Sequence, residues 1–294
     1  MAAGGRTGAA LVQLSGPAAS RLPSLARQYL GDAGSALVSA LSPSVRLRLT
    51  HACDPASPAS RLGGMALLAD GQRWPVTGDG TPLSFIGQIS TADISAPDGC
   101  PPLPAGSLLA FFYEATGQEA WGNDPADGPF WRVIAAPRGT AVPVTAPGGA
   151  EVFPAHQVVP EHVITVPDQD EPINDAFLDT ADDALGRLYQ ELGSGAHGPR
   201  HRMFGWPELV QNPMQLECQL ASHGIRTGGP AGYRDPRVPE LRGGAPDWLL
   251  LLQVDTDDGV GWMWGDSGTI YYWIRRQDLH RARFDHTWMI LQCC

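Results

Sequence analysis

Two stretches of the sequence decide the fold: SFIGQIS at residues 84–90 and LLLQVD at residues 250–255. Each is an apolar run with one interior glutamine and a polar exit, which is typical of a buried β-strand. Each is followed by a glycine and an aromatic strand, and each is preceded by an Arg-x-x-Gly motif that starts at Arg61 or Arg202. Three matched features in the same order indicate that the chain contains an internal duplication.

Further runs extend this pattern along the chain. Alternation of apolar and polar residues at 45–49 predicts a half-buried strand, and a turn signal at residues 137–139 separates two shorter strands. We therefore expect an α+β fold made of two related, mainly antiparallel β-sheet modules with a few packing helices. In full, the other expected strands and the bounds of the two interior-glutamine strands are residues 83–89, 108–113, 131–135, 141–144, 158–166, 249–255, 269–274 and 287–292. Helices are expected at 18–30, 214–220 and 276–281.

Composition divides the chain into four segments. After residue 166, acidic residues lead into apolar residues at helical spacing, which predicts an acidic helix between two β-rich parts. We expect the two β-rich modules to pack as one globular unit. The expected segments are an N-terminal helical extension at 1–41, a first β-rich module at 42–166, an acidic linker helix at 167–199 and a second β-rich module at 200–294.

The overall composition limits the function classes. The chain has 294 residues, of which 43% are hydrophobic and 17% charged, so it can bury a core and is not disordered throughout. A net charge of -11 argues against a nucleic-acid partner or an anionic membrane surface. All twenty basic residues are arginine, which excludes catalysis by a Schiff-base lysine and phosphate binding by a P-loop lysine.

The cysteines and the apolar runs of the sequence indicate the cellular compartment of the protein. Five cysteines without a CxxC pair do not make a zinc ribbon or a disulfide scaffold, and they favour a reducing compartment. No apolar run approaches the roughly 20 residues that a bilayer requires, and the N-terminus lacks the apolar core of a signal peptide. We therefore expect a cytoplasmic protein with no membrane partner.

Carboxylates gather after the second interior-glutamine strand. If the next strand returns antiparallel, Asp255, Asp257 and Asp266 converge at one sheet edge, with His201 nearby as a proton shuttle. Convergent carboxylates bind a divalent cation or perform acid–base chemistry, which predicts an enzyme of hydrolase or cyclase type. The alternative is that these aspartates bond backbone amides in tight turns. No metal site and no cofactor are otherwise predicted.

The arginine motifs and nearby tryptophans suggest a binding site instead. Arg61 and Arg202 hold matching places beside glycines, and guanidinium groups grip carboxylates and phosphates. Arg61 with Trp74 would form one side of a ligand-binding cleft between the two repeats, and Arg202 with Trp206 would form the other side. The alternative is that each arginine makes a structural ion pair.

Four further residues belong to this binding hypothesis. Gln88 and Gln253 sit inside apolar strands and need partners there, either backbone groups of a crossing loop or a ligand. Trp262 and Trp264 lie in a loop beside the aspartates, where exposed aromatic rings would suit recognition.

The same segments resemble a known family, the bacterial YwqG-like proteins, which are domains of unknown function. The resemblance covers roughly residues 42–294. The sequence departs from the family at residues 65–68, where a proline-containing stretch is expected, and at Cys294, which replaces an aromatic end. The segments that carry the resemblance are SRLGG at 60–64, WP at 74–75, PLSFIGQI at 82–89, LPAG at 103–106, HRMFGWP at 201–207, Gln211, residues 248–255, WGDSG at 264–268, residues 278–279 and 284–285, and ILQC at 290–293.

The resemblance implies an intracellular, antiparallel α+β fold with a duplicated core, but it supplies no activity. Some YwqG-like proteins are encoded near toxin systems, which implies an accessory or immunity role. We therefore expect a non-catalytic binding protein that grips a small molecule or a protein partner between its repeats. The alternative is the enzyme built on the aspartates.

Overall fold

The computed structural model describes residues 13–14, 16–168, 170–172, 184, 187–188, 191–192 and 198–294. The acidic linker helix expected within residues 167–199 therefore lies mostly outside the described residues. The four segment boundaries drawn from composition stay predictions.

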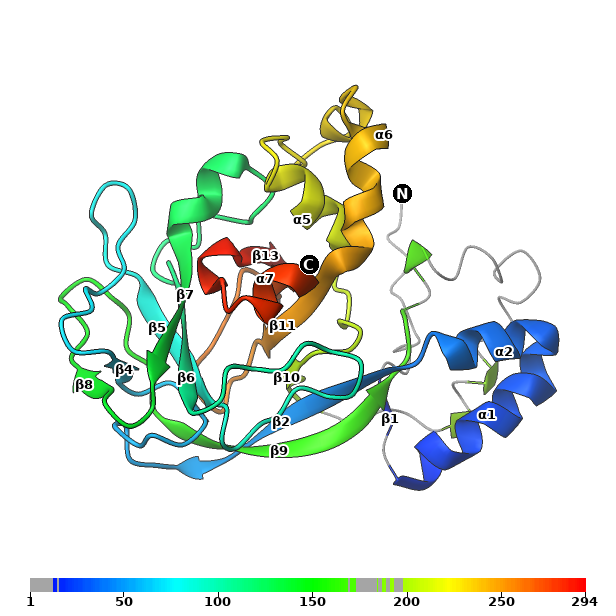
Figure 1. Cartoon of the computed structure of the whole chain (residues 1–294), viewed down its shortest axis with the longest axis horizontal. Coiled ribbons are helices and arrows are strands. Elements are labelled where there is room, and N and C mark those ends of the chain that lie inside the picture. Colours follow the sequence, from blue (N-terminus) through cyan, green and yellow to red (C-terminus); the bar gives the residue numbers. More distant parts are fainter. Residues whose placement is uncertain are drawn as a thin grey trace.

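One antiparallel sheet of eleven strands organises the described chain (Figure 1). A two-residue strand, β1 (Gln13–Leu14), pairs with β9 beside the main path of the sheet. Along that path the order is β13 (Trp288–Gln292), β12 (Thr269–Arg275), β11 (Trp248–Asp255), β10 (Arg202–Met203), β2 (Ser42–Ala52), β9 (His156–Thr165), β3 (Arg61–Leu62), β5 (Ser84–Ser90), β6 (Ser107–Tyr113) and β7 (Trp131–Pro137).

The expected α+β fold of two sheet modules is wrong, because the described chain is mostly β and all its strands except β4 and β8 belong to one sheet. The reason lies in the two longest strands, β2 and β9, which pair with each other over almost their whole length. On one side β2 pairs with β10 of the second half, and on the other side β9 pairs with β3 of the first half. The matched segments are therefore two ends of one sheet.

The sheet curls so that its ends approach each other and give it a near-barrel shape (Figure 1). The indole Nε1 of Trp131 in β7 donates a hydrogen bond to the Thr287 carbonyl beside β13, at 2.9 Å. The rings of Trp131 and Trp288 meet edge to face, with centroids 5.1 Å apart. These contacts close the curl with aromatic packing instead of a backbone ladder.

Strand alternation divides the apolar side chains between the inside of the curl and its outer layers. In β12, Ile270 and Tyr272 face the main core, whereas Tyr271 and Trp273 pack against helix α5 (Gln215–Ala221). A small second sheet of β4 (Ala66–Leu68) and β8 (Val142–Val144) belongs to another apolar cluster, beside β5 and β6.

The helices are short and lie outside the sheet (Figure 1). Helices α1 and α2 share an apolar cluster with β1, away from α5 and α6. No helix in the described part of the chain is long and apolar enough to cross a membrane. The other helical segments are α1 (Gly16–Leu30), α2 (Asp32–Ser39), η1 (Pro125–Phe130), η3 (Gly232–Arg234), α6 (Val238–Leu241), η4 (Arg242–Asp247), α7 (Arg276–His280) and η5 (Phe284–His286).

Candidate functional site

The two arginine motifs occupy corresponding places in the sheet. Arg61 in β3 lies opposite Gln88 in β5, and Arg202 in β10 lies opposite Gln253 in β11. Both arginines are fully buried. The sequence pattern therefore marks two equivalent pairs of buried polar residues, one in each half of the sheet.

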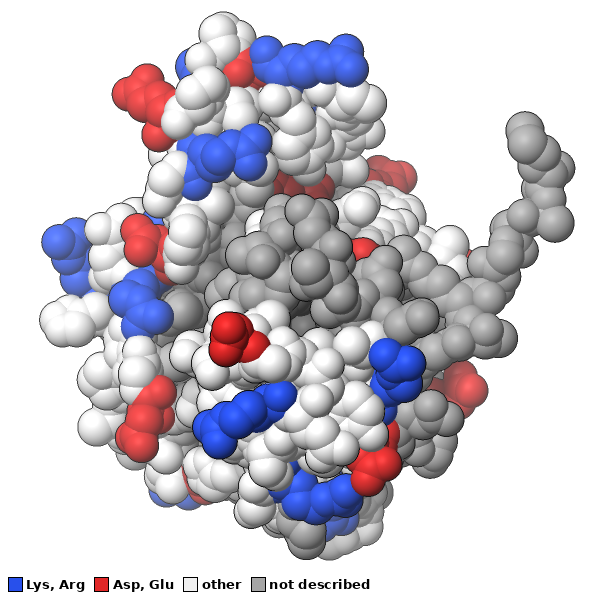
Figure 2. Space-filling view, turned by 90° about the vertical axis from the view of Figure 1, so that its right-hand side faces the viewer, with Lys and Arg blue, Asp and Glu red and all other residues white. Residues whose placement is uncertain are grey.

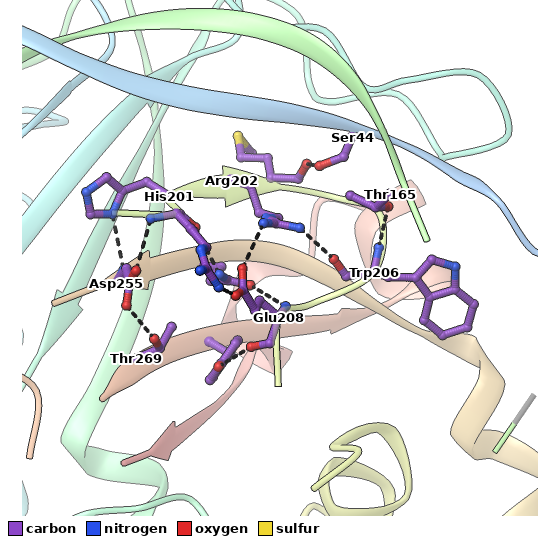
Figure 3. Close-up of polar contacts among 12 residues, drawn as sticks. Ser44, Thr165, His201, Arg202, Trp206, Glu208, Asp255 and Thr269 are labelled. Carbon is purple, nitrogen blue, oxygen red and sulfur yellow. Dashed lines mark hydrogen bonds and ion pairs between the residues drawn. The ribbon is translucent and has the colours of Figure 1, made fainter. Parts of the chain in front are cut away.

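Arg202 lies at the centre of a buried polar network beside β10 (Figure 3). Its guanidinium donates to the Trp206 carbonyl at 3.3 Å and to Glu208 Oε2 at 3.4 Å. Burial lowers the pKa of Arg202 to about 10, and the nearby charge of Arg200 adds to this effect. Arg202 therefore makes a structural ion pair with Glu208, and its side chain does not face an open cleft.

Glu208 connects this network to the neighbouring strands (Figure 3). Its second carboxylate oxygen contacts the guanidinium of Arg200. Its backbone N–H donates to Gln253 Oε1 at 3.0 Å, and its carbonyl accepts the Tyr271 hydroxyl at 2.5 Å. Gln253 Nε2 donates to the Arg200 carbonyl at 2.9 Å, so both ends of this interior amide are bonded.

Arg61 is held differently, because its guanidinium bonds backbone carbonyls instead of a carboxylate. It donates to the carbonyls of Ser57 at 3.1 Å, Gly63 at 2.6 Å and Met65. Burial lowers its pKa to about 10. Gln88 Nε2 donates to the Ala59 carbonyl at 3.3 Å, so this pair together anchors the loop before β3 and the turn after it.

The two tryptophans near the arginines also make structural bonds. Trp74 Nε1 donates to the Leu83 carbonyl at 2.8 Å, and its ring meets Phe112 edge to face. Trp206 Nε1 donates to the Ala40 carbonyl at 2.7 Å. Of the two, Trp206 also lines a cavity of about 320 Å³, whose walls include Trp248 and Trp273.

His201, Asp255 and Asp257 form a second polar cluster at the end of β11, of which Figure 3 shows His201 and Asp255. The backbone N–H of Asp255 donates to His201 Nδ1 at 3.1 Å, so Nε2 carries the ring proton and donates to Asp257 Oδ2 at 3.2 Å. This hydrogen bond is the main cause that lowers the pKa of Asp257. Both nitrogens of the buried imidazole are thus occupied by the strand end and its loop.

Each of these aspartates uses both carboxylate oxygens. Asp255 accepts the Arg200 N–H at 3.0 Å and the Thr269 hydroxyl at 2.8 Å. Asp257 accepts the Gly259 N–H at 2.8 Å in addition to His201. The exposed Asp266 side chain makes no hydrogen bond or ion pair with any described residue. Among the described residues, no group of three His, Cys, Asp or Glu side chains is placed to hold a metal ion.

Trp262 and Trp264, expected to be exposed for recognition, are buried. Their rings pack on Phe153 with centroids 5.7 and 6.0 Å away. Trp262 also meets the His201 ring edge to face. The expectation of exposure is wrong because the glycine-rich loop after β11 folds back onto the core and carries both rings inside.

A pocket that the sequence did not predict lies between α5 and β13. It encloses about 600 Å³ and combines residues of the 121–123 loop with residues of the second half of the chain. We call it the α5–β13 pocket, and the side chains that matter to its chemistry are those of Trp121, Asn123, Gln211, Glu217, Tyr233 and Arg234.

Close backbone contacts hold one wall of this pocket. Gly122 has φ +79°, and a Cβ there would overlap the Met289 carbonyl, so only glycine lets this loop approach β13. Leu291 N donates to the Trp121 carbonyl at 3.1 Å, and Trp288 Nε1 donates to the Gly122 carbonyl at 2.8 Å. Trp121 and Asn123 are therefore fixed against the sheet.

The opposite wall is tied to the same loop. The backbone N–H and the hydroxyl of Thr227 both donate to the Asn123 carbonyl, at 2.7 and 3.2 Å. Gln292 Oε1 accepts the N–H of Gln211 at 3.0 Å, and its Nε2 donates to the Asn212 carbonyl at 2.7 Å. The pocket is therefore formed without a ligand, as ligand sites commonly are.

The ionisable groups in the pocket are perturbed by burial. Burial raises the pKa of Glu217 to about 7, and its hydrogen bond from the Thr227 hydroxyl, at 3.3 Å, only partly offsets this. Burial and the charge of Glu217 raise the pKa of Tyr233 to about 12. A buried carboxyl that titrates near neutrality is a common feature of functional sites.

Surface charge does not single out another site on the face that Figure 2 shows. Arginine and acidic side chains are interspersed there, without a large patch of one sign among the coloured residues.

Comparisons with known proteins place the chain in a family without assigning a reaction. A search among curated proteins found no match. The family model described as "Domain of unknown function (DUF1963)" matches residues 60–293, which include both arginine motifs and every residue of the α5–β13 pocket. The chain belongs to the DUF1963 family of domains of unknown function.

Proposed function

We propose that this protein is a non-catalytic binding protein and that its ligand occupies the α5–β13 pocket. The observation that carries the proposal is a pre-formed cavity of about 600 Å³ with a partly buried carboxyl, a guanidinium and two aromatic rings in its walls. The pocket joins residues from both halves of the chain, whereas Arg61 and Arg202 are buried within the fold.

The enzyme hypothesis has less support from the contacts around its residues. General acid–base catalysis needs a group within hydrogen-bond reach of a substrate. The carboxylates of Asp255 and Asp257 instead bond the strand end and its loop, and His201 is buried between them. We therefore assign these three residues a structural role.

Two finer assignments accompany the proposal. We infer a YwqG-like protein of bacterial origin from the matching segments in the sequence, which extend through ILQC at residues 290–293. We infer a cytoplasmic location from the five free cysteines, because exposed thiols such as Cys294 persist in reducing compartments.

A blocked-pocket variant tests the proposal. A Cβ at Gly229, which lines the pocket, would have no heavy atom within 4 Å, so Gly229→Phe adds an aromatic side chain at the pocket wall without a clash at Cβ. Gly243→Phe adds the same ring at an equally open position on η4, away from the pocket. The melting temperature of each protein is measured with a library of metabolites.

We expect at least one compound to raise the melting temperature of the wild type and of Gly243→Phe but not of Gly229→Phe. A ligand at 100 times its dissociation constant adds about 2.7 kcal/mol to the free energy of unfolding. NMR of the same mixtures should show the compound unchanged. The proposal fails if no compound binds, if binding survives in Gly229→Phe, or if the protein converts the compound.

A further inference from the structure

Two groups of opposite charge in the α5–β13 pocket lack an ionic partner. Glu217 accepts one hydrogen bond, from the neutral Thr227 hydroxyl, and no cationic side chain among the described residues makes an ion pair with it. The Arg234 guanidinium likewise contacts no carboxylate within the described part of the chain. The two charges do not neutralise each other, although both residues line one cavity.

Several other charged groups of the fold are paired within the chain. Arg202 pairs with Glu208, Arg226 pairs with Asp124, and Arg237 just after η3 pairs with Asp235. Buried charges are normally paired, because an unpaired one loses its hydration without compensation. The carboxyl of Glu217 is partly buried without an ionic partner, and the exposed guanidinium of Arg234 lines the same cavity, so one ligand can contact both groups.

The two positions differ in depth. Glu217 projects from the first turn of α5 and is partly buried, whereas Arg234 ends η3 and is exposed. The rings of Trp121 and Tyr233 line the cavity as well. Aromatic faces attract cations, so they add to the preference for a positive group beside Glu217.

We propose that the pocket binds a zwitterion, an amino acid or a short peptide, with its ammonium group on Glu217 and its carboxylate on Arg234. This inference rests on the proposed function, because it names the ligand class of the same pocket. The ammonium group would donate to the Glu217 carboxylate, and the guanidinium of Arg234 would donate to the ligand carboxylate in the two-point geometry that arginine favours.

Binding should then depend on pH. An ammonium group favours the ionised form of Glu217, whose pKa without ligand is about 7, so binding releases a proton below that pH. The other ionisable groups near Glu217 are Tyr233 and Cys218, whose pKa values are raised to about 12 and well above the usual range, and Arg234. Affinity should fall by about tenfold for each pH unit below 7.

The test uses matched sets of three compounds. α-Amino acids, ω-amino acids from β-alanine to 6-aminohexanoate, and dipeptides are each compared with the N-acetyl derivative and the carboxamide of the same compound. The N-acetyl form lacks the cation and the carboxamide lacks the anion. Affinities are measured by calorimetry on the full chain.

We expect at least one zwitterion to bind, and both of its derivatives to bind at least tenfold more weakly. Glu217→Gln should remove the pH dependence and the advantage over the N-acetyl form, and Arg234→Gln should remove the advantage over the carboxamide. Glu240→Gln on α6 and Arg242→Gln on η4 make the same changes at exposed positions outside the pocket and should bind as the wild type does.

Two results would overturn the inference and separate it from the proposed function. If a neutral or singly charged compound binds at least as tightly as every zwitterion, and Gly229→Phe blocks it, the ligand class is wrong and the binding function stands. If no compound binds at all, both proposals fall.

Discussion

The two arginines of the corresponding motifs show how a sequence signal for function can mark structure. Arginine beside glycine suggested a ligand clamp, but Arg61 bonds carbonyls and Arg202 bonds a carboxylate of its own chain. Full burial of the side chain distinguishes a structural arginine from one that clamps a ligand. Burial could not be predicted here, because each arginine lies in a two-residue strand whose partner strands lie more than 25 residues away in the sequence. The structural alternative is the one that the contacts support.

Replacing Arg202 should lower stability far more than replacing Arg200. Arg202→Met removes a fully buried partner of Glu208 and leaves the Trp206 carbonyl without its donor, which should cost about 3 kcal/mol of unfolding free energy. Arg200 contacts the same carboxylate from a partly exposed position, so Arg200→Met should cost about 1 kcal/mol or less. Urea unfolding measures both values, and equal losses would contradict the assignment.

Replacing Asp257 should likewise lower the free energy of unfolding more than replacing Asp266, the other aspartate after β11. Asp257→Ala removes the acceptor for His201 and for the Gly259 N–H, and should lower the free energy of unfolding by about 2 kcal/mol. Asp266→Ala removes an exposed side chain and should change it by less than about 0.5 kcal/mol. Equal losses for the two variants in thermal or urea unfolding would contradict this difference between a bonded and an unbonded aspartate.

Glu217 should make stability depend on pH even without a ligand. Its pKa in the fold, about 7, lies above the usual value of 4.5, so the stability present below pH 4.5 is lost as the pH rises through 7. Glu217→Gln should therefore melt like the wild type at pH 4 and at a higher temperature at pH 8. Glu240→Gln is the control, and an equal difference at both pH values would contradict the burial of this carboxyl.

At the scale of elements, the strands could be predicted from the sequence and the pocket could not. The longer strands carry period-two alternation or continuous apolar runs, and β2, β5 and β12 lie where these patterns placed them. Two-residue strands such as β3 and β10 carry no such pattern. Their pairing depends on the loops that Arg61 and Arg202 hold.

The pocket escaped prediction because its groups come from loops and from one helix turn. Asn123 and Arg234 lie more than 100 residues apart and share no periodic pattern. Glu217 on α5 reads as an ordinary solvent-facing residue of an amphipathic helix. The glycine- and proline-rich residues 224–247 form η3, α6 and η4, and residues 227–234 of this segment line one side of the pocket.

The approach of the 121–123 loop to β13 depends on Gly122. Gly122→Ala combines a positive φ with a clash against the Met289 carbonyl, whereas Gly71→Ala has almost the same φ, +74°, and open space around its Cβ. The strain alone costs about 1–2 kcal/mol, so we expect that loss at Gly71 and a clearly larger one at Gly122. Similar losses in urea unfolding would mean that the loop does not contact β13 as described.

At the scale of the whole molecule, one sheet in place of two modules explains where the pocket lies. The sheet curls until β7 approaches β13, which brings the loop between β6 and β7 onto the last strand and next to α5. A binding site built from the first and second halves of the chain is therefore a consequence of the curl. The duplicated pattern indicated that the halves are related, but it did not indicate how they join.

The nine tryptophans allow a direct test of where a ligand binds. The indole N–H signals are followed by ¹H–¹⁵N NMR while the compound that most raises the melting temperature is added, with each signal assigned by single Trp→Phe variants. Our account predicts that the Trp121 signal moves and that those of Trp74 and Trp206 stay in place. It is contradicted if the signals of Trp74 or Trp206 move while that of Trp121 does not.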